Sequence, residues 1–175
     1  GLSKQRALLI SNRTYVELVR AVPILVLILW VYYGLPQIAE ISISVFWAGV
    51  IALAVSDSAF QAEIFRAGIN SINKGQHEIS ESLGMSFWKK MRLVILPQAI
   101  KVVLPAMGNQ FVYVLKMSSL VSIIGIGDLT RKANELVVTT YRPLEIYTFL
   151  IVEYLVLILI VSYLVRKLEK KLQKD

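Results

Sequence analysis

Three charged side chains stand inside long apolar stretches of the sequence. Asp57, Lys116 and Glu153 each fall near the middle of a separate hydrophobic run. A charge at the centre of a bilayer is costly, so each is expected to face the protein interior and to pair with another charge or contact a polar solute. We therefore predict that these three residues bind substrate, the acids holding cationic groups and the lysine an anionic one. A structural Lys–acid pair that keeps the spans in register is an equally good interpretation.

Other chemistries find little support in the residue types. The sequence has no Cys and one His, His77, so we predict no metal site and interpret the histidine as a surface residue. Three serines near Lys116 have no His or acid placed to activate them, and we interpret them as small packing residues (Ser118, Ser119, Ser122). No G-x-x-x-x-G-K-[ST] phosphate loop occurs, so ATP binding of that kind is not predicted. An enzymatic function is therefore disfavoured.

The long apolar runs predict an all-α integral membrane protein. Hydrophobic residues make up 56% of the 175-residue chain, and the mean hydropathy is +0.63, which is unusual for a soluble domain. Residues 1–20 combine four basic residues with an apolar face and predict an interfacial helix. Four spans are predicted, at residues 21–36 (extending back to Tyr15, with a kink at Pro23), 44–68, 102–125 and 145–165. Glu63 and Arg66, three residues apart, are expected to form a structural or gating ion pair near the interface.

The positive charges are distributed unevenly around these spans. Residues 1–20, 66–101 and 166–175 contain four, six and five of the nineteen Lys and Arg residues, fifteen in all. Because cytoplasmic segments are enriched in Lys and Arg, we predict that these three segments lie in the cytoplasm. This distribution accounts for the formal net charge of +7, and no nucleic-acid-binding motif accompanies it. We therefore expect membrane lipid, and no nucleic acid, as a partner.

The most polar long stretch is Gln76–Pro97, within a connection of about residues 70–100. Its pattern predicts a short helix, a sharp turn at Gly84 and a second helix, with Pro97 ending that helix or starting the next one. Glu78 and Glu81 are expected near the start of the first helix, where carboxylates favour the positive end of the dipole. A helix–glycine–helix outside the bilayer, flanked by spans, indicates a docking surface. A plain solvated loop is the weaker alternative.

At this point the residues resemble the EAA loop of ABC importer permeases. Glu78, Gly84 and the terminal Leu96–Pro97 fill its motif, whereas Ile79–Ser80 replaces the usual double Ala and Val94 the usual Ile. Further blocks are similar to permeases of polar amino-acid uptake systems, in the order RAVPILVLILWVYYGLP (20–36), AEIFRAGINSINKGQ (62–76), ILPQA (95–99), LPAMGNQF (104–111), SSLVSIIGIGDL (118–129) and YRPLEIY (141–147). The resemblance covers nearly the whole chain.

This resemblance implies the helical bundle of a type I ABC importer permease, as a single transmembrane domain over residues 1–175. It assigns ATPase coupling to one set of residues in the EAA-type loop: Glu78, Glu81, Ser82, Leu83, Gly84, Met85, Phe87 and Trp88. Members of the family look like five-span proteins with an outside N-terminus. A fifth, N-terminal span is therefore expected in addition to the four that the sequence offers.

The implied function is to pass polar amino acids across the prokaryotic cytoplasmic (inner) membrane. The implied partners are cytoplasmic ATP-binding subunits that carry ATP and Mg, a second permease subunit (identical or related), and an extracytoplasmic substrate-binding protein or fused domain. Two acids against one base, in Asp57, Glu153 and Lys116, weakly favour cationic amino acids. Alternatives are an importer of the same fold for another small solute, such as an opine or osmolyte, and a membrane channel or scaffold not coupled to ATP.

Overall fold

The computed structural model describes residues 6–172, and the described part of the chain is built from helices joined by short connections. The elements follow the order α1 (Arg6–Ala21), α2 (Ile24–Leu29), α3 (Leu35–Ala39), α4 (Val45–Asn70), α5 (Lys74–Ser82), α6 (Phe87–Lys90), α7 (Leu96–Met117), α8 (Leu129–Thr140) and α9 (Pro143–Leu172). Two π-helical turns, η1 (Trp30–Gly34) and η2 (Met91–Ile95), and a 3₁₀ segment, η3 (Ser118–Ile124), join neighbouring helices.

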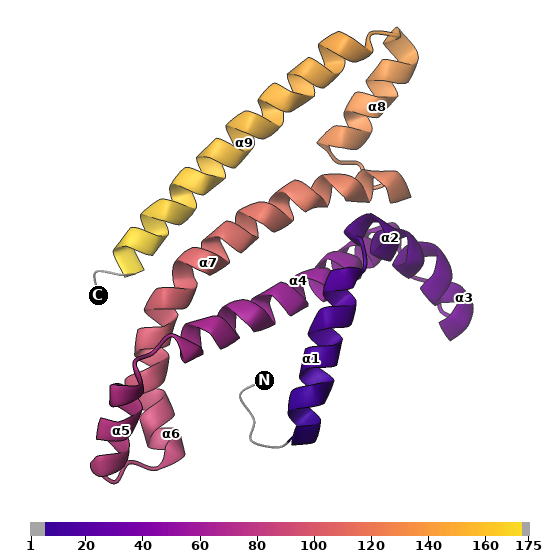
Figure 1. Ribbon diagram of the computed structural model, residues 1–175. Coiled ribbons are helices and arrows are strands. Elements are labelled where there is room, and N and C mark those ends of the chain that lie inside the picture. The colour runs from indigo at the N-terminus through magenta and orange to yellow at the C-terminus, as the bar shows by residue number, and fades with distance from the viewer. Residues whose placement is uncertain (1–5, 173–175) are drawn as a thin grey trace.

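Three helical stretches are long and apolar enough to cross a membrane: Val45–Asn70, Phe87–Ile124 and Pro143–Leu172. They confirm the spans predicted at 44–68, 102–125 and 145–165. In Figure 1, α7 lies between α4 and α9, the α5–α6 hairpin lies at one end of the molecule, and α8 lies at the other with the tip of α9. Residues 126–144, between the second and third of these stretches, contain the amphipathic helix α8.

The first predicted span differs from expectation. Residues 10–21 and 24–39 form two helical arms that meet at 96°, so 21–36 is not one straight span. The kink predicted at Pro23 is confirmed and is much sharper than expected, because Pro23 adopts an extended ψ of 131° and has no N–H to continue the helix. Helix α1, the described part of the predicted interfacial helix, packs along α4. Residues 1–5 lie outside the described residues.

Pro97 lies in the first turn of α7, so of its two predicted roles the structure shows the start of a helix and not the end of one. The helix that starts at Phe87 continues through η2 into α7. A proline inside a helix removes one hydrogen bond and clashes with the carbonyl four residues earlier. Here the wider π-helical turn Met91–Ile95 lies directly before Leu96 and Pro97 and accommodates that clash. The second helix of the EAA-type segment is therefore continuous with a membrane span.

Small residues allow close packing between the helices. Ala48 and Ala52 on α4 are fully buried in a cluster that also contains Ile28 from α2 and Val121 and Ile124 from η3. Toward the other end of α4, Gly68 lies so close to α7 that an added Cβ would overlap Val103 Cγ2. These contacts fix α4 against α7. The α5–α6 hairpin is the connection between these two helices.

We predict that Gly68→Ala destabilises the protein by about 1–3 kcal/mol, because its methyl group overlaps Val103. The measurement is the thermal unfolding of the detergent-solubilised chain. Val103→Ala in the same chain removes the overlapping group and should restore most of the loss. Gly127→Ala is the control, since a Cβ there meets nothing within 4 Å. Equal stability of Gly68→Ala and wild type would contradict the packing.

Candidate coupling segment and intramembrane charges

Helix α5 begins and ends with clear local signals. The Asn73 side chain caps its start by accepting a hydrogen bond from the Gly75 N–H at 2.8 Å. Its end is a Schellman motif: the Gly84 N–H donates to the Glu81 carbonyl at 2.9 Å, and the Met85 N–H donates to the Ser80 carbonyl at 3.1 Å. This motif requires a left-handed residue, and Gly84 has φ = +69°. The sequence prediction of a turn at Gly84 is confirmed.

Because the helix starts directly after Asn73, the two predicted acids lie further along it than expected. Because α5 starts at Lys74, Glu78 lies in its middle and Glu81 in its last turn. The expectation that both lie near the helix start is therefore wrong. The signal that could have placed them is Asn73 itself, since asparagine is among the strongest N-cap residues.

An ion pair closes the hairpin across the glycine turn. Lys90 Nζ lies 2.6 Å from Glu81 Oε1, and the Lys90 side chain is 11% exposed. Beside it, the buried Ser80 hydroxyl donates to the Gln76 carbonyl at 2.6 Å. The Lys90 ammonium is thus paired within the chain. The pair fixes the angle between α5 and the helix that runs into the membrane.

We predict that removing this pair loosens the hairpin. A double-mutant cycle with Lys90→Met and Glu81→Gln should give a coupling energy of about 1 kcal/mol in thermal unfolding, because one partner is exposed. The Arg131–Glu135 pair on α8 has both side chains exposed, at 45% and 47%, and serves as the matched control, with a coupling of about 0.5 kcal/mol or less. Equal coupling in the two cycles would contradict a structural role for Lys90.

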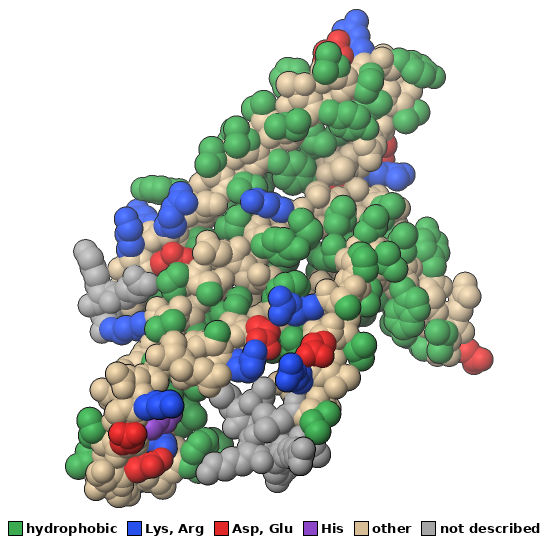
Figure 2. All heavy atoms as spheres, viewed as in Figure 1, with side chains coloured by type: hydrophobic (Ala, Val, Ile, Leu, Met, Phe, Trp, Pro, Cys, Tyr) green, Lys and Arg blue, Asp and Glu red, His purple; other side chains and the backbone are tan. Residues whose placement is uncertain are grey.

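The rest of the hairpin presents apolar side chains to its surroundings. Leu83 is 70% and Trp88 79% exposed, and Ile79, Phe87 and Leu93 are also exposed. Of the predicted coupling residues, Met85 is half-buried and the others are exposed (Glu78, Glu81, Ser82, Leu83, Gly84, Phe87, Trp88). Figure 2 shows apolar, acidic and basic side chains intermixed over this end of the molecule. An exposed apolar cluster next to the spans indicates a protein-binding surface, which we call the coupling surface.

The three intramembrane charges do not meet in one site. The Asp57 carboxylate accepts hydrogen bonds from Gln110 Nε2 at 2.6 Å and Gln61 Nε2 at 3.1 Å, between α4 and α7. Lys116 lies on the side of α7 toward α9, where it lines cavities of about 330 and 400 Å³. Glu153 is exposed on α9. The sequence did not identify Gln110, which lies 53 residues from Asp57.

The cavities beside Lys116 and Asp57 nevertheless share one lining side chain. Tyr113 lines both the small cavity beside Asp57 and the 330 Å³ cavity beside Lys116. Among the described residues, Lys116 forms no ion pair or hydrogen bond through its ammonium group. It is therefore a cation within a span without a structural partner among residues 6–172, which is the arrangement expected of a solute contact or of pairing with another subunit.

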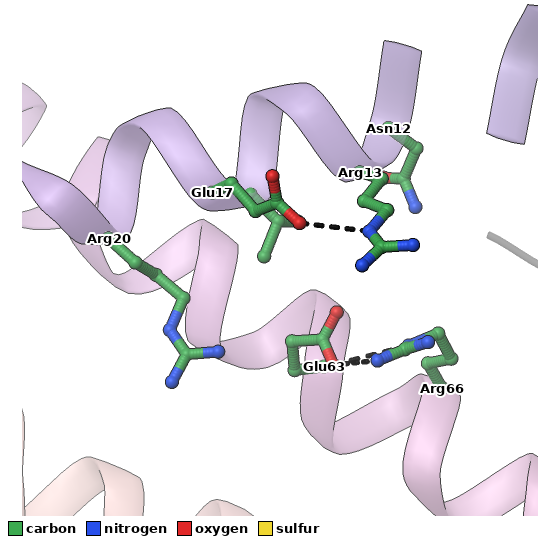
Figure 3. Close-up of a pocket in the computed structure, with 7 residues that line it drawn as sticks. Asn12, Arg13, Glu17, Arg20, Glu63 and Arg66 are labelled. Carbon is green, nitrogen blue, oxygen red and sulfur yellow. Dashed lines mark hydrogen bonds and ion pairs between the residues drawn. The ribbon is translucent and has the colours of Figure 1, made fainter. Parts of the chain in front are cut away.

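A second polar cavity lies between α1 and α4. It has a volume of about 490 Å³ and is lined by Asn12, Arg13, Val16, Glu17, Arg20, Glu63 and Arg66. Figure 3 shows Arg20 extending from α1 toward α4, and the two ion pairs Arg13–Glu17 and Glu63–Arg66 beside it. The predicted Glu63–Arg66 pair is confirmed. We call this cavity the α1–α4 groove.

These features define a class of protein before any relative is considered: a multi-pass membrane component with a coupling surface at one end and charged side chains on its long apolar helices. The chain belongs to the family described as the binding-protein-dependent transport system inner membrane component, which matches residues 3–174. It is thus a transport component rather than an enzyme, with the fold of a type I ABC importer permease that works with an ATPase and other subunits.

Two curated relatives illustrate the family. The chain is 38% identical to the arginine transport system permease protein ArtQ of Bacillus subtilis over 92% of this chain and 74% of that protein. It is 36% identical to the glutamine transport system permease protein GlnP of Escherichia coli over 91% and 73%.

Solved structures agree with the fold. An amino acid ABC transporter crystallised with histidines superposes with a TM-score of 0.89 at 44% identity, covering 97% of this chain and 79% of that one. The MetNI methionine ABC transporter superposes with a TM-score of 0.77 at 21% identity, covering 99% and 77%, and supports the fold alone.

Proposed function

We propose that this chain is the permease subunit of an ATP-driven importer of polar amino acids. The observation that carries the proposal is the coupling surface: a capped helix, a Schellman turn and an internal ion pair hold exposed apolar side chains at the end of a helix that continues into a span. A rigid hairpin of this kind transmits movement instead of absorbing it. The names of the similar permeases, for arginine and glutamine, support amino acids as the solute class.

The partners follow from what the chain contains and exposes. Cytoplasmic ATP-binding subunits would carry ATP and Mg and dock on the coupling surface. A second permease subunit would cover α9, where no residue is buried and where Glu153 would otherwise face lipid at high cost. An extracytoplasmic binding protein or fused domain would deliver the solute. The excess of Lys and Arg on the hairpin side supports a cytoplasmic coupling segment and C-terminus.

Asp57, Lys116 and Glu153 are our candidates for solute contact. Lys116 is supported best, because its ammonium is unpaired beside two cavities. Asp57 is held by two amide donors, and the buried Gln61 Oε1 beside it has no hydrogen-bond donor among the described residues. This concentration of acceptors suits an ammonium or guanidinium group.

We predict that Asp57→Asn and Glu153→Gln each lower arginine uptake more than glutamine uptake, by about fivefold or more, because each removes a negative charge that the extra cationic group favours. The measurement is competitive uptake of the two labelled amino acids by cells carrying the variant. Glu145→Gln, in the first turn of α9 and eight residues before Glu153, is the control and should leave the ratio unchanged. An unchanged ratio in both variants would remove the charge argument for substrate selectivity.

The proposed function itself is tested by reconstitution. The chain, co-purified with its ATP-binding subunit, is placed in vesicles with the cognate binding protein, and uptake of labelled arginine and glutamine is followed. We expect uptake that requires ATP and the ATP-binding subunit. Uptake that continues when the ATP-binding subunit is left out would favour a channel. ATP-dependent uptake of an unrelated solute only would favour an importer of another solute class.

A further inference from the structure

The α1–α4 groove carries more positive than negative charge. Three guanidinium groups and two carboxylates line it. Arg13 pairs with Glu17 at 2.8 Å and Arg66 pairs with Glu63, so each carboxylate has its own arginine. Arg20 forms no ion pair or hydrogen bond among the residues that the structure describes, and its charge acts on the Glu63 carboxylate only at longer range. One cationic group in the groove is therefore available to an anionic ligand.

The position of Arg20 is held by packing. Its guanidinium lies over the Phe60 ring, 5.0 Å from the ring centroid, a cation–π contact that orients the planar group. Figure 3 shows the side chain reaching from α1 toward α4 in the same groove as Glu63. Figure 2 shows basic and acidic side chains gathered over this region on a visible face of the molecule. The free donors of Arg20 are thus both fixed and accessible.

The groove also lies where a membrane surface is expected. Along α4, the apolar run ends at Val55, and Glu63 and Arg66 come two to three turns later, on the way to the hairpin. Helix α1 exposes Ile10 and Leu18, at 59% and 64%. A basic groove at the polar end of a span, next to exposed apolar side chains, matches a lipid molecule with an anionic headgroup and acyl chains.

We propose that the α1–α4 groove binds the headgroup phosphate of an anionic phospholipid, with Arg20 as its principal anchor and Arg13 and Arg66 as flanking donors. Glu17 and Glu63 orient the flanking arginines and limit the groove to a single anionic group. Arginine suits this role because its planar donors engage phosphate oxygens in pairs. The proposal concerns lipid recognition and does not depend on which solute is transported.

The test is native mass spectrometry of the full chain, purified in detergent with the subunits that co-purify. Dioctanoyl phosphatidylglycerol, dioctanoyl phosphatidylcholine and inorganic phosphate are titrated separately. We expect one phosphatidylglycerol per chain to bind about tenfold or more tightly than phosphatidylcholine. Arg20→Gln should weaken phosphatidylglycerol binding by about tenfold or more, since it removes a charge-assisted contact. Arg131→Gln, an exposed arginine in an i,i+4 pair on α8, is the control and should leave binding unchanged.

The remaining outcomes are equally decisive. If Arg20→Gln lowers the melting temperature of the lipid-free protein, Arg20→Lys is compared with wild type instead. Lysine keeps the charge but loses the paired donors, and should weaken phosphatidylglycerol binding severalfold. Equal affinity for phosphatidylglycerol in wild type and in the folded Arg20 variant would overturn the proposal. Inorganic phosphate that displaces the lipid completely at the lipid's own concentration would overturn it as well, in favour of a free-anion site.

Discussion

Substitution of Gly84 by Ala is expected to weaken association with the ATP-binding subunit by about five- to thirtyfold. The cost arises in the backbone, because Gly84 has φ = +69° and a Cβ there would meet nothing within 4 Å. A left-handed conformation costs an ordinary L-residue about 1–2 kcal/mol, which corresponds to that range of affinity. Relaxation of the strain would break the Schellman bonds of Gly84 and Met85 and turn the exposed Leu83 and Trp88 away from their docking positions.

Two further variants separate backbone strain from side-chain size. Gly84→Asn should retain more association than Gly84→Ala, because Asn tolerates the left-handed region best among residues with a side chain. Gly127→Ala introduces the same methyl group at an open position without positive φ, and should have no effect. The measurement is co-elution and binding affinity of the purified ATP-binding subunit. Gly84→Ala binding as tightly as wild type would show that the turn is not needed for docking.

Lys116→Gln is expected to lower ATP-dependent amino-acid uptake by about tenfold or more while leaving association with the ATP-binding subunit unchanged. The reason is that the ammonium of Lys116 has no structural partner among the described residues and lines two cavities. Its removal should therefore cost a substrate contact instead of stability. Uptake at increasing substrate concentration should show mainly a raised KM, as expected when a binding contact is lost.

Lys101→Gln is the matched control for this prediction, because Lys101 is also an exposed lysine on α7 but lies toward the hairpin, outside both cavities. It should transport normally. Normal uptake by Lys116→Gln would show that Lys116 does not contact the solute. Loss of uptake together with a lower thermal unfolding temperature would show that its role is structural.

Local chemistry made part of this structure predictable from sequence. The turn at Gly84 and the kink at Pro23 depend on the special backbone properties of single residues, and the three long spans depend on runs of apolar residues. The size of the bend at Pro23 was not predictable, since it is set by packing of α1 and α2 on α4. Continuity through Pro97 was missed because a π-helical turn has no recognised sequence signal.

The candidate site was predictable only where contacts are local. Glu63–Arg66 are three residues apart and were identified from spacing alone. By contrast, Lys90 meets Glu81 across a turn, and Asp57 meets Gln110 from another helix, 53 residues away. The unpaired state of Arg20 and Lys116 depends on every neighbouring side chain. The sequence shows which charges lie in apolar surroundings, and the structure shows which of them are paired with another side chain.

The most direct test of the account uses the absence of native cysteine from the chain. Leu83→Cys and Tyr141→Cys each introduce a single thiol, at positions that are 70% and 86% exposed at opposite ends of the bundle. In the assembled transporter we expect a short bifunctional reagent to cross-link Leu83→Cys to the ATP-binding subunit, and Tyr141→Cys to give no such product. Cross-linking from Tyr141→Cys, or none from Leu83→Cys in an active transporter, would contradict the assignment of the hairpin as the coupling element.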